Sequence, residues 1–107
     1  MYYTHVAETP EKAQAQAEGP WVTHERISAA DRGLPDRPPR DWATVVSKNR
    51  AIFGDPEMCR QHIRRIQSEL GLTRVACVFH FGGLPQDRVL ASMRLFAEEV
   101  APAFASA

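Results

Sequence analysis

The chain has 107 residues, with 13 lysines and arginines against 13 aspartates and glutamates, so its formal net charge is zero. The charges also balance locally, with seven of each sign in residues 1–50 and six of each in residues 51–107. A nucleic-acid binder needs a basic surplus to displace counterions, so this balance argues against a nucleic-acid partner. A hydrophobic content of 44% is that of a globular chain, and the length allows one small domain.

The sequence also indicates the cellular compartment of the protein. The longest apolar run, residues 75–79, is far shorter than the roughly 20 residues that span a bilayer, so we expect no membrane partner. The first residues show neither the basic nor the apolar region of a signal peptide, and two cysteines cannot form a disulfide framework. These features favour a cytoplasmic location.

The first elements in chain order are a strand and a helix. Residues 2–7 are aromatic and β-branched, which favours a strand. Thr9 is a suitable N-cap and Pro10 suits the first helical position. Alanines and glutamines then continue the helix until Gly19 and Pro20, which we expect to interrupt it, with a second and weaker helical segment from residue 21 to about residue 30.

The middle of the chain is rich in loop-forming residues. Residues 31–40 contain three prolines and one glycine, which exclude a continuous helix or a central strand. A long loop of this kind inside a small domain is typical of an insertion. We therefore treat residues 31–50 as a loop-rich insertion.

The second half begins with a clearly marked helix. Asp55 is a suitable N-cap, Pro56 suits the first turn, and Gly71 stands where a left-handed C-terminal glycine belongs. Apolar and small side chains at helical spacing predict one buried stripe, made of Cys59, His62, Ile63, Ile66 and Leu70.

A strand and a final helix follow. Residues 73–79 read as a strand, and the apolar run 75–79 predicts burial on both faces, as in a parallel sheet. After a turn at residues 81–85, a long amphipathic helix is expected from Gln86 to near Pro102. Its predicted buried positions are Val89, Leu90, Met93, Phe96, Ala97, Val100 and Phe104.

The order of elements predicts an α/β protein in which residues 2–7 and 73–79 are parallel neighbours with helices on the sheet. A sheet of two strands is only marginally stable, so a stable parallel sheet would need more strands than the two predicted here. We therefore expect poor stability as a monomer, open strand edges and self-association.

Three segments of the chain carry distinctive motifs. Residues 3–13 are a strand followed by Val-Ala-Glu-Thr, and residues 52–57 end in the helix start Gly-Asp-Pro-Glu. Residues 79–104 combine the end of a strand, a Gly-Gly loop and a helix with Leu-Phe-Ala-Glu-Glu-Val-Ala-Pro. In this order, the three segments resemble the carboxy-terminal end of the luciferase-like monooxygenases, the flavin-dependent family that includes the bacterial luciferases, with its Val-Ala-Glu-Thr strand end, its Gly-Ser/Thr-Pro-Glu helix start and its closing Leu-Phe-x-Glu-Glu-Val-x-Pro helix.

The resemblance implies that residues 1–107 are the C-terminal fragment of a (β/α)8 TIM barrel, comprising its last two βα units, since a complete barrel needs about 250 residues. It implies an oxidoreductase that uses FMN or a related flavin, reduced directly or by an NAD(P)H-linked reductase, and O₂ to oxygenate a small organic substrate. Some relatives use a deazaflavin and act as dehydrogenases, and the resemblance fits that activity as well. The catalytic residues would lie outside this fragment, which is expected to be inactive alone.

The resemblance also points to one loop as a cofactor site. Barrel active sites lie at the carboxyl ends of the strands, which here means His80, Phe81, Gly82 and Gly83. The two glycines permit positive φ and close approach to a planar ring. Phe79 or Phe81 would pack against the flavin, and His80 would hydrogen-bond to the cofactor or the substrate. The same glycines also suit a tight strand-to-helix connection without any ligand.

Other polar residues have weaker claims. His5 in the first strand is more typical of a half-buried, hydrogen-bonded histidine than of a catalytic one. Trp21 and His24 would touch substrate only if their segment covers the barrel mouth, and a Trp there is more typical of an apolar anchor. Lys48 and Arg50 would suit a phosphate or a reduced nicotinamide, but such residues are usually just solvated.

Cys59 and His62, together with Cys77 and His80, imitate a zinc-binding set. An odd separation of three on a strand sends Cys77 and His80 to opposite faces, so we expect no metal and interpret both cysteines as small buried hydrophobes.

Two other functional classes are alternatives to the hypothesis of an enzyme fragment. One is a non-catalytic α/β module that folds through self-association or with a partner chain. The other is an independent small α+β domain whose likeness to the family is coincidental. Flavin absorbance and oligomeric state separate the three.

Overall fold

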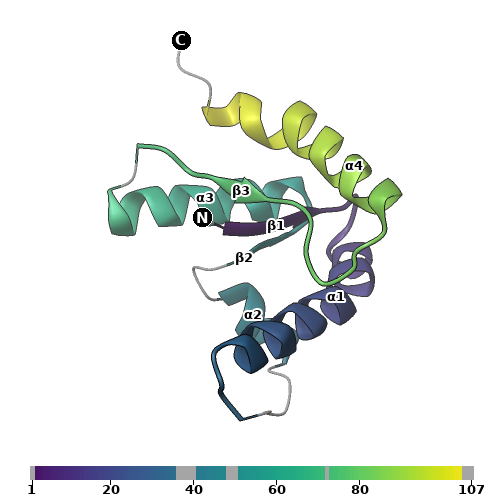
Figure 1. Ribbon diagram of the computed structural model, residues 1–107. Helices are drawn as coiled ribbons and strands as arrows, with labels where there is room; N and C mark the ends of the chain where they lie inside the picture. Colours follow the sequence, from purple (N-terminus) through teal and green to yellow (C-terminus); the bar gives the residue numbers. More distant parts are fainter. Residues whose placement is uncertain (1, 36–40, 48–50, 72, 105–107) are drawn as a thin grey trace.

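The computed structural model describes residues 2–35, 41–47, 51–71 and 73–104. A parallel sheet of three strands, β1 (Tyr2–Val6), β2 (Ala51–Gly54) and β3 (Cys77–Val78), has the order β2-β1-β3. Figure 1 shows α1 (Pro10–Asp31) and α2 (Trp42–Ser47) on one side of this sheet and α4 (Gln86–Leu95) on the other. The fold is therefore α/β, with β1 in the centre.

The predicted pairing of the first and last strands is confirmed. β1 and β3 are parallel neighbours, with Tyr2 opposite Cys77 and Tyr3 opposite Val78. The expected length and burial of the last strand are wrong, because only Cys77 and Val78 are strand and both are half-buried. An apolar run can be fully buried only when a neighbour covers it, and β3 lies at the edge of the sheet.

β2 was not predicted, because its residues were interpreted only as the approach to a helix. It pairs with β1 from Tyr3–Ala51 to Val6–Gly54, and all four of its residues are buried. Consecutive units of a barrel would give the order 1-2-3 with every helix outside. Here a strand that follows the predicted insertion lies on the far side of β1.

α1 is one continuous helix, so the expected interruption at Gly19 and Pro20 is wrong. The predicted cap is confirmed, since the Thr9 hydroxyl accepts a hydrogen bond from the Lys12 amide at 3.1 Å. Pro20 has no N–H to donate to the Gln16 carbonyl, which normally weakens a helix. Burial of Ala17 and Trp21 on either side of Pro20 compensates for this lost bond.

The predicted insertion is not entirely loop. α1 ends at Asp31, and Gly33 follows with a φ of 69°. Part of the segment forms the short helix α2, whose first amides include Thr44 N, which donates to the Asp41 carboxylate at 2.9 Å.

The structure confirms α3 (Pro56–Leu70) within its predicted bounds. The Asp55 carboxylate accepts from the Met58 amide at 2.9 Å, and Gly71 closes the helix with a φ of 63°. The one error in the buried stripe is Leu70, which is 53% exposed because the last turn extends beyond the sheet.

The last helix changes character along its length. α4 is followed by a π-helical turn, η1 (Phe96–Val100), and a 3-10 turn, η2 (Ala101–Phe104). Three positions that were expected to be buried are exposed: Leu90 (53%), Met93 (45%) and Ala97. Ser92 is buried in their place, and its hydroxyl accepts from the Val6 amide at 2.8 Å. A π turn changes the helical register, and Val100 at the end of this turn is fully buried.

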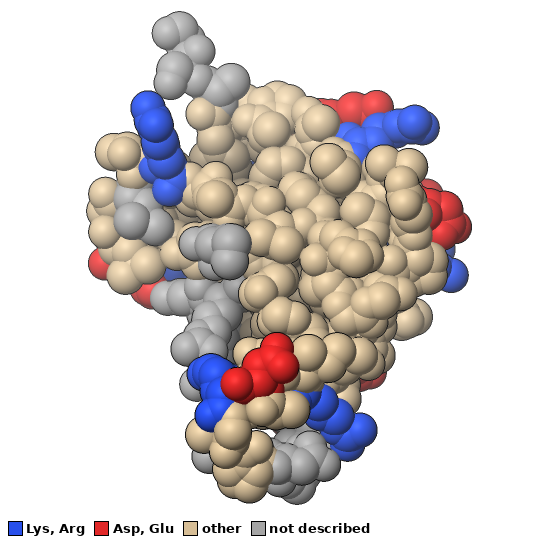
Figure 2. Space-filling model, in the orientation of Figure 1, with Lys and Arg blue, Asp and Glu red and all other residues tan. Residues whose placement is uncertain are grey.

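Two hydrophobic clusters cover the two faces of the sheet. One joins α1, α2 and β2 with Phe81 and Leu84, and the other joins β1 and β2 with α3 and η1. On the face shown in Figure 2, acidic and basic side chains are few, with mixed groups at the right edge and in the lower part and one basic side chain alone at the upper left. Within the described residues, no helix has the length and apolar character needed to cross a membrane.

Candidate functional site

The loop after β3 holds the four residues predicted to contact a flavin, and the structure divides them. His80 and Gly83 are exposed, whereas Phe81 is buried and Gly82 is half-buried. Gly82 and Gly83 adopt φ values of 56° and 76°, which only glycine adopts readily. The need for glycine in this turn is therefore structural at both positions.

Gly82 has a second constraint, which is contact with α1. A Cβ at this position would lie 1.7 Å from the carbonyl oxygen of Pro20. The helix backbone thus fills the space that a ring would need in order to approach Gly82. The close approach predicted from the sequence exists, but its partner in this chain is α1.

Phe81 belongs to a cluster of aromatic rings. Its ring centroid lies 5.6 Å from Phe53, 5.9 Å from Tyr3 and 6.0 Å from Trp21. Phe53 in turn stacks on Trp42 at 5.2 Å. Aromatic pairs at these separations stabilise a core by offset and edge-to-face contacts. Phe81 is therefore a core residue here.

His5 is more buried than expected, with no exposed surface. Its Nε2 lies 2.8 Å from the Gln16 side-chain oxygen, while Nδ1 finds no hydrogen-bond partner within the described part of the chain. Burial lowers the pKa of His5, and the hydrogen bond to Gln16 opposes that effect. The ring is accordingly neutral near pH 7 and links β1 to α1, as a hydrogen-bonded structural histidine does.

The remaining candidates on α1 pack against the aromatic cluster. Trp21 is 8% exposed and contacts Tyr3, so the apolar-anchor interpretation describes it. The His24 ring lies 4.3 Å from Tyr3, and burial lowers its pKa. Lys48 and Arg50 lie outside the described residues.

The cysteines do not form a site with the histidines. Cys59 is fully buried, and burial raises its pKa to about 12, so its thiol is unreactive. Cys77 packs half-buried beside the cluster that contains Cys59, whereas His80 is exposed. In the part of the chain that the structure describes, no three His, Cys, Asp or Glu side chains are grouped to hold a metal ion.

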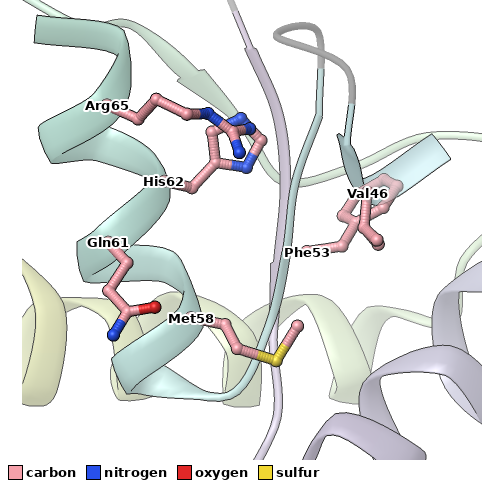
Figure 3. Close-up of a pocket in the computed structure, with 6 residues that line it drawn as sticks. All are labelled: Val46, Phe53, Met58, Gln61, His62 and Arg65. Carbon is pink, nitrogen blue, oxygen red and sulfur yellow. The ribbon is translucent and has the colours of Figure 1, made fainter. Parts of the chain in front are cut away.

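A groove between α2, β2 and α3 was not found from the sequence. Its volume is about 370 Å³, and its lining consists of Val46, Phe53, Met58, Gln61, His62 and Arg65 (Figure 3). The sequence placed His62 in the buried stripe of α3, which is correct. The groove itself depends on α2 and β2, neither of which was predicted.

The fold defines the class of this protein as α/β, built on a parallel sheet with helices on both faces. No family model matches the chain, and no curated protein matches it. Among solved structures, the chain is similar to the monooxygenase RslO1 from Streptomyces bottropensis, with a TM-score of 0.80 and 25% identity. The match covers 97% of this chain and 30% of RslO1, so the chain spans less than a third of that protein. It has the fold of part of a monooxygenase.

Proposed function

We propose that this chain is the C-terminal part of a flavin-dependent luciferase-like monooxygenase that uses reduced flavin and O₂ to oxygenate an organic substrate. The observation that carries the proposal is the likeness to RslO1 over 97% of the chain. The three motifs that resemble the luciferase-like family support it independently. Activity then belongs to a longer protein or an assembly, because this chain matches only 30% of RslO1.

The proposal gives each strand a place in a barrel. β1 and β3 are parallel neighbours, as adjacent barrel strands are, and α3 and η1 cover one face of them. β2 follows the loop-rich segment 31–50 and contains the first residues of the family-like motif 52–57, and the likeness to RslO1 covers 97% of the chain. We therefore propose that β2 belongs to the family fold, as a strand that the two predicted βα units did not include.

The loop after β3 fits a flavin only in part. Phe81 and Gly82 are covered by α1 and do not fit a cofactor contact in this arrangement. His80 and Gly83 are exposed beside them and suit one wall of a site. We therefore propose that residues outside this chain hold most of an FMN or related flavin.

The alternative, a non-catalytic module that folds through association, is favoured by one observation. β3 is a half-buried edge strand, and Leu90 and Met93 on α4 are exposed. An open edge and exposed large apolar side chains are typical of a surface that pairs with another chain.

A chimera tests the proposed function. This chain replaces the matching 30% of RslO1, and monooxygenase activity is measured with the substrate of RslO1. We expect a folded chimera with retained activity, whereas the 107-residue chain alone binds no flavin. A chimera with a native-like circular dichroism spectrum but no activity would contradict the proposal, as would a lone chain that purifies with stoichiometric yellow cofactor.

Variants of the chimera test the site. His80→Ala should weaken flavin affinity several-fold if His80 lines the flavin site. Arg74→Ala changes an exposed residue before β3 and serves as the control, with affinity unchanged. Equal flavin affinity in both variants would remove His80 from the site.

A further inference from the structure

The groove between α2, β2 and α3 has the size and lining of a site for a small ligand. Its volume of about 370 Å³ falls in the usual range for ligand pockets, roughly 300–1,000 Å³. Figure 3 shows Met58, His62 and Arg65 projecting from α3 toward the side where Val46 and Phe53 form the opposite wall, while Gln61 runs along the helix. One wall is therefore mainly polar and the other apolar.

His62 is the unusual residue of this groove. His62 is only 7% exposed, and its Nε2 atom has no hydrogen-bond partner among the residues that the structure describes. A buried polar atom without a partner is costly, and such atoms are rare in native proteins. Burial, with a smaller effect of the Arg65 charge, lowers the pKa of His62 to about 4, so the ring is neutral at pH 7. A neutral ring has one N–H to donate.

Arg65 supplies the charge in the groove. Its side chain is exposed, and its contact with the Ser47 carbonyl, at 3.5 Å, lies at the limit of a hydrogen bond. Gln61 is already engaged, since its amide donates to Glu57 at 3.1 Å. The guanidinium of Arg65 is therefore the group best placed to recognise an anion, and carboxylate is the anion that its planar fork fits.

Addition of a peptide strand is a poor fit for the same groove. Ala51, Ile52 and Phe53 of β2 are at most 2% exposed, so the outer edge of β2 is covered. A strand-adding peptide needs an open row of backbone groups, which β2 does not present. The groove suits a compact ligand.

We propose that this groove binds a small organic carboxylate. The carboxylate pairs with the Arg65 guanidinium and accepts a hydrogen bond from His62 Nε2, while the hydrocarbon part packs against Phe53, Val46 and Met58. Because Nε2 is closed to water, a ligand reaches it only when a side chain of the groove wall moves. This site is separate from the loop after β3 and does not depend on the proposed enzyme function.

Benzoate is the probe, and benzamide, which has the same shape but no charge, is the matched ligand control. The full chain is titrated while the NMR signals of the His62 ring are followed. We expect saturable shifts with benzoate, and at least tenfold weaker binding of benzamide. Shifts that do not saturate, or equal binding of the two compounds, would overturn the proposal.

Two charge-removing variants locate the site. Arg65→Gln should weaken benzoate binding at least tenfold. Arg94→Gln removes the same charge from the exposed end of α4 and should leave binding unchanged. The NMR signal of the Met58 methyl group is a second reporter. On addition of benzoate it should shift in the parent chain and in Arg94→Gln, but not in Arg65→Gln. Equal losses in the two variants would show that benzoate responds only to net charge, and the proposal would fall.

Discussion

Gly82, in the loop after β3, lies directly against the backbone of α1. The left-handed backbone alone disfavours any other residue, by about 1–2 kcal/mol. The 1.7 Å approach of a Cβ to Pro20 O adds a clash with helix backbone, which no side-chain rotation relieves. We expect Gly82→Ala to lower the free energy of unfolding by about 2–5 kcal/mol.

Gly83→Ala is the matched control for that prediction. Gly83 shares the left-handed conformation, but a Cβ there would meet nothing within 4 Å. Gly83→Ala should therefore lower the free energy of unfolding only by the cost of the left-handed backbone, about 1–2 kcal/mol. Chemical denaturation measures the free energy of unfolding of both variants. Equal effects at the two positions would show that the Pro20 contact contributes nothing.

His62 should make stability depend on pH. Its pKa of about 4 in the folded chain lies below the ordinary value of 6.5, so the native state binds fewer protons between these values. Its contribution is then complete above about pH 6.5 and is lost as the pH falls toward 4, by up to about 3 kcal/mol. Denaturation of His62→Gln at about pH 7 and pH 4.5 should show a smaller difference than the parent chain.

The exposed His80 provides the comparison for this experiment. His80→Gln should keep the pH dependence of the parent chain. If His62→Gln and His80→Gln both retain that dependence, burial of His62 is not its source.

At the scale of elements, α1 is stable despite the residues at its centre. Pro20 removes one helical hydrogen bond and Gly19 adds backbone entropy, while a Cβ at Gly19 would meet nothing within 4 Å. Pro20→Ala should therefore raise the free energy of unfolding by about 1–3 kcal/mol and Gly19→Ala by about 0.5–1 kcal/mol. Thermal denaturation followed by circular dichroism measures both, and a lower melting temperature for Pro20→Ala would contradict this account.

The helices α1 and α3 show which features a sequence pattern can predict and which it cannot. Caps such as Thr9, Asp55 and Gly71 act through neighbouring backbone, so their positions could be predicted. The continuity of α1 depends on the burial of Ala17 and Trp21 by residues distant in sequence, and local propensity does not contain that information.

Strands and the groove depend even more on distant contacts. β2 has only four residues and forms because β1 offers an edge to pair with. Leu90 and Met93 fit a helical period, yet they are exposed because none of the described residues covers that face of α4. In the loop after β3, the sequence indicated a close approach at Gly82 but not its partner.

At the scale of the whole molecule, the two edges of the sheet are unlike. The residues of β2 are buried, whereas Cys77 and Val78 of β3 remain half-exposed. Leu90 and Met93 on α4 are exposed as well. Unpaired backbone at an edge strand and large exposed apolar side chains both favour association.

We therefore expect the purified chain to self-associate, with a sedimentation coefficient that rises with concentration. Leu90→Glu combined with Met93→Lys keeps the net charge and should shift the chain toward monomer, because charged side chains resist burial. Ile27→Lys, at a residue of α1 that is 55% exposed, is the control and should leave association unchanged. A chain that sediments as a monomer at all concentrations and unfolds in one cooperative step would contradict this prediction, because its exposed apolar face would then need no partner.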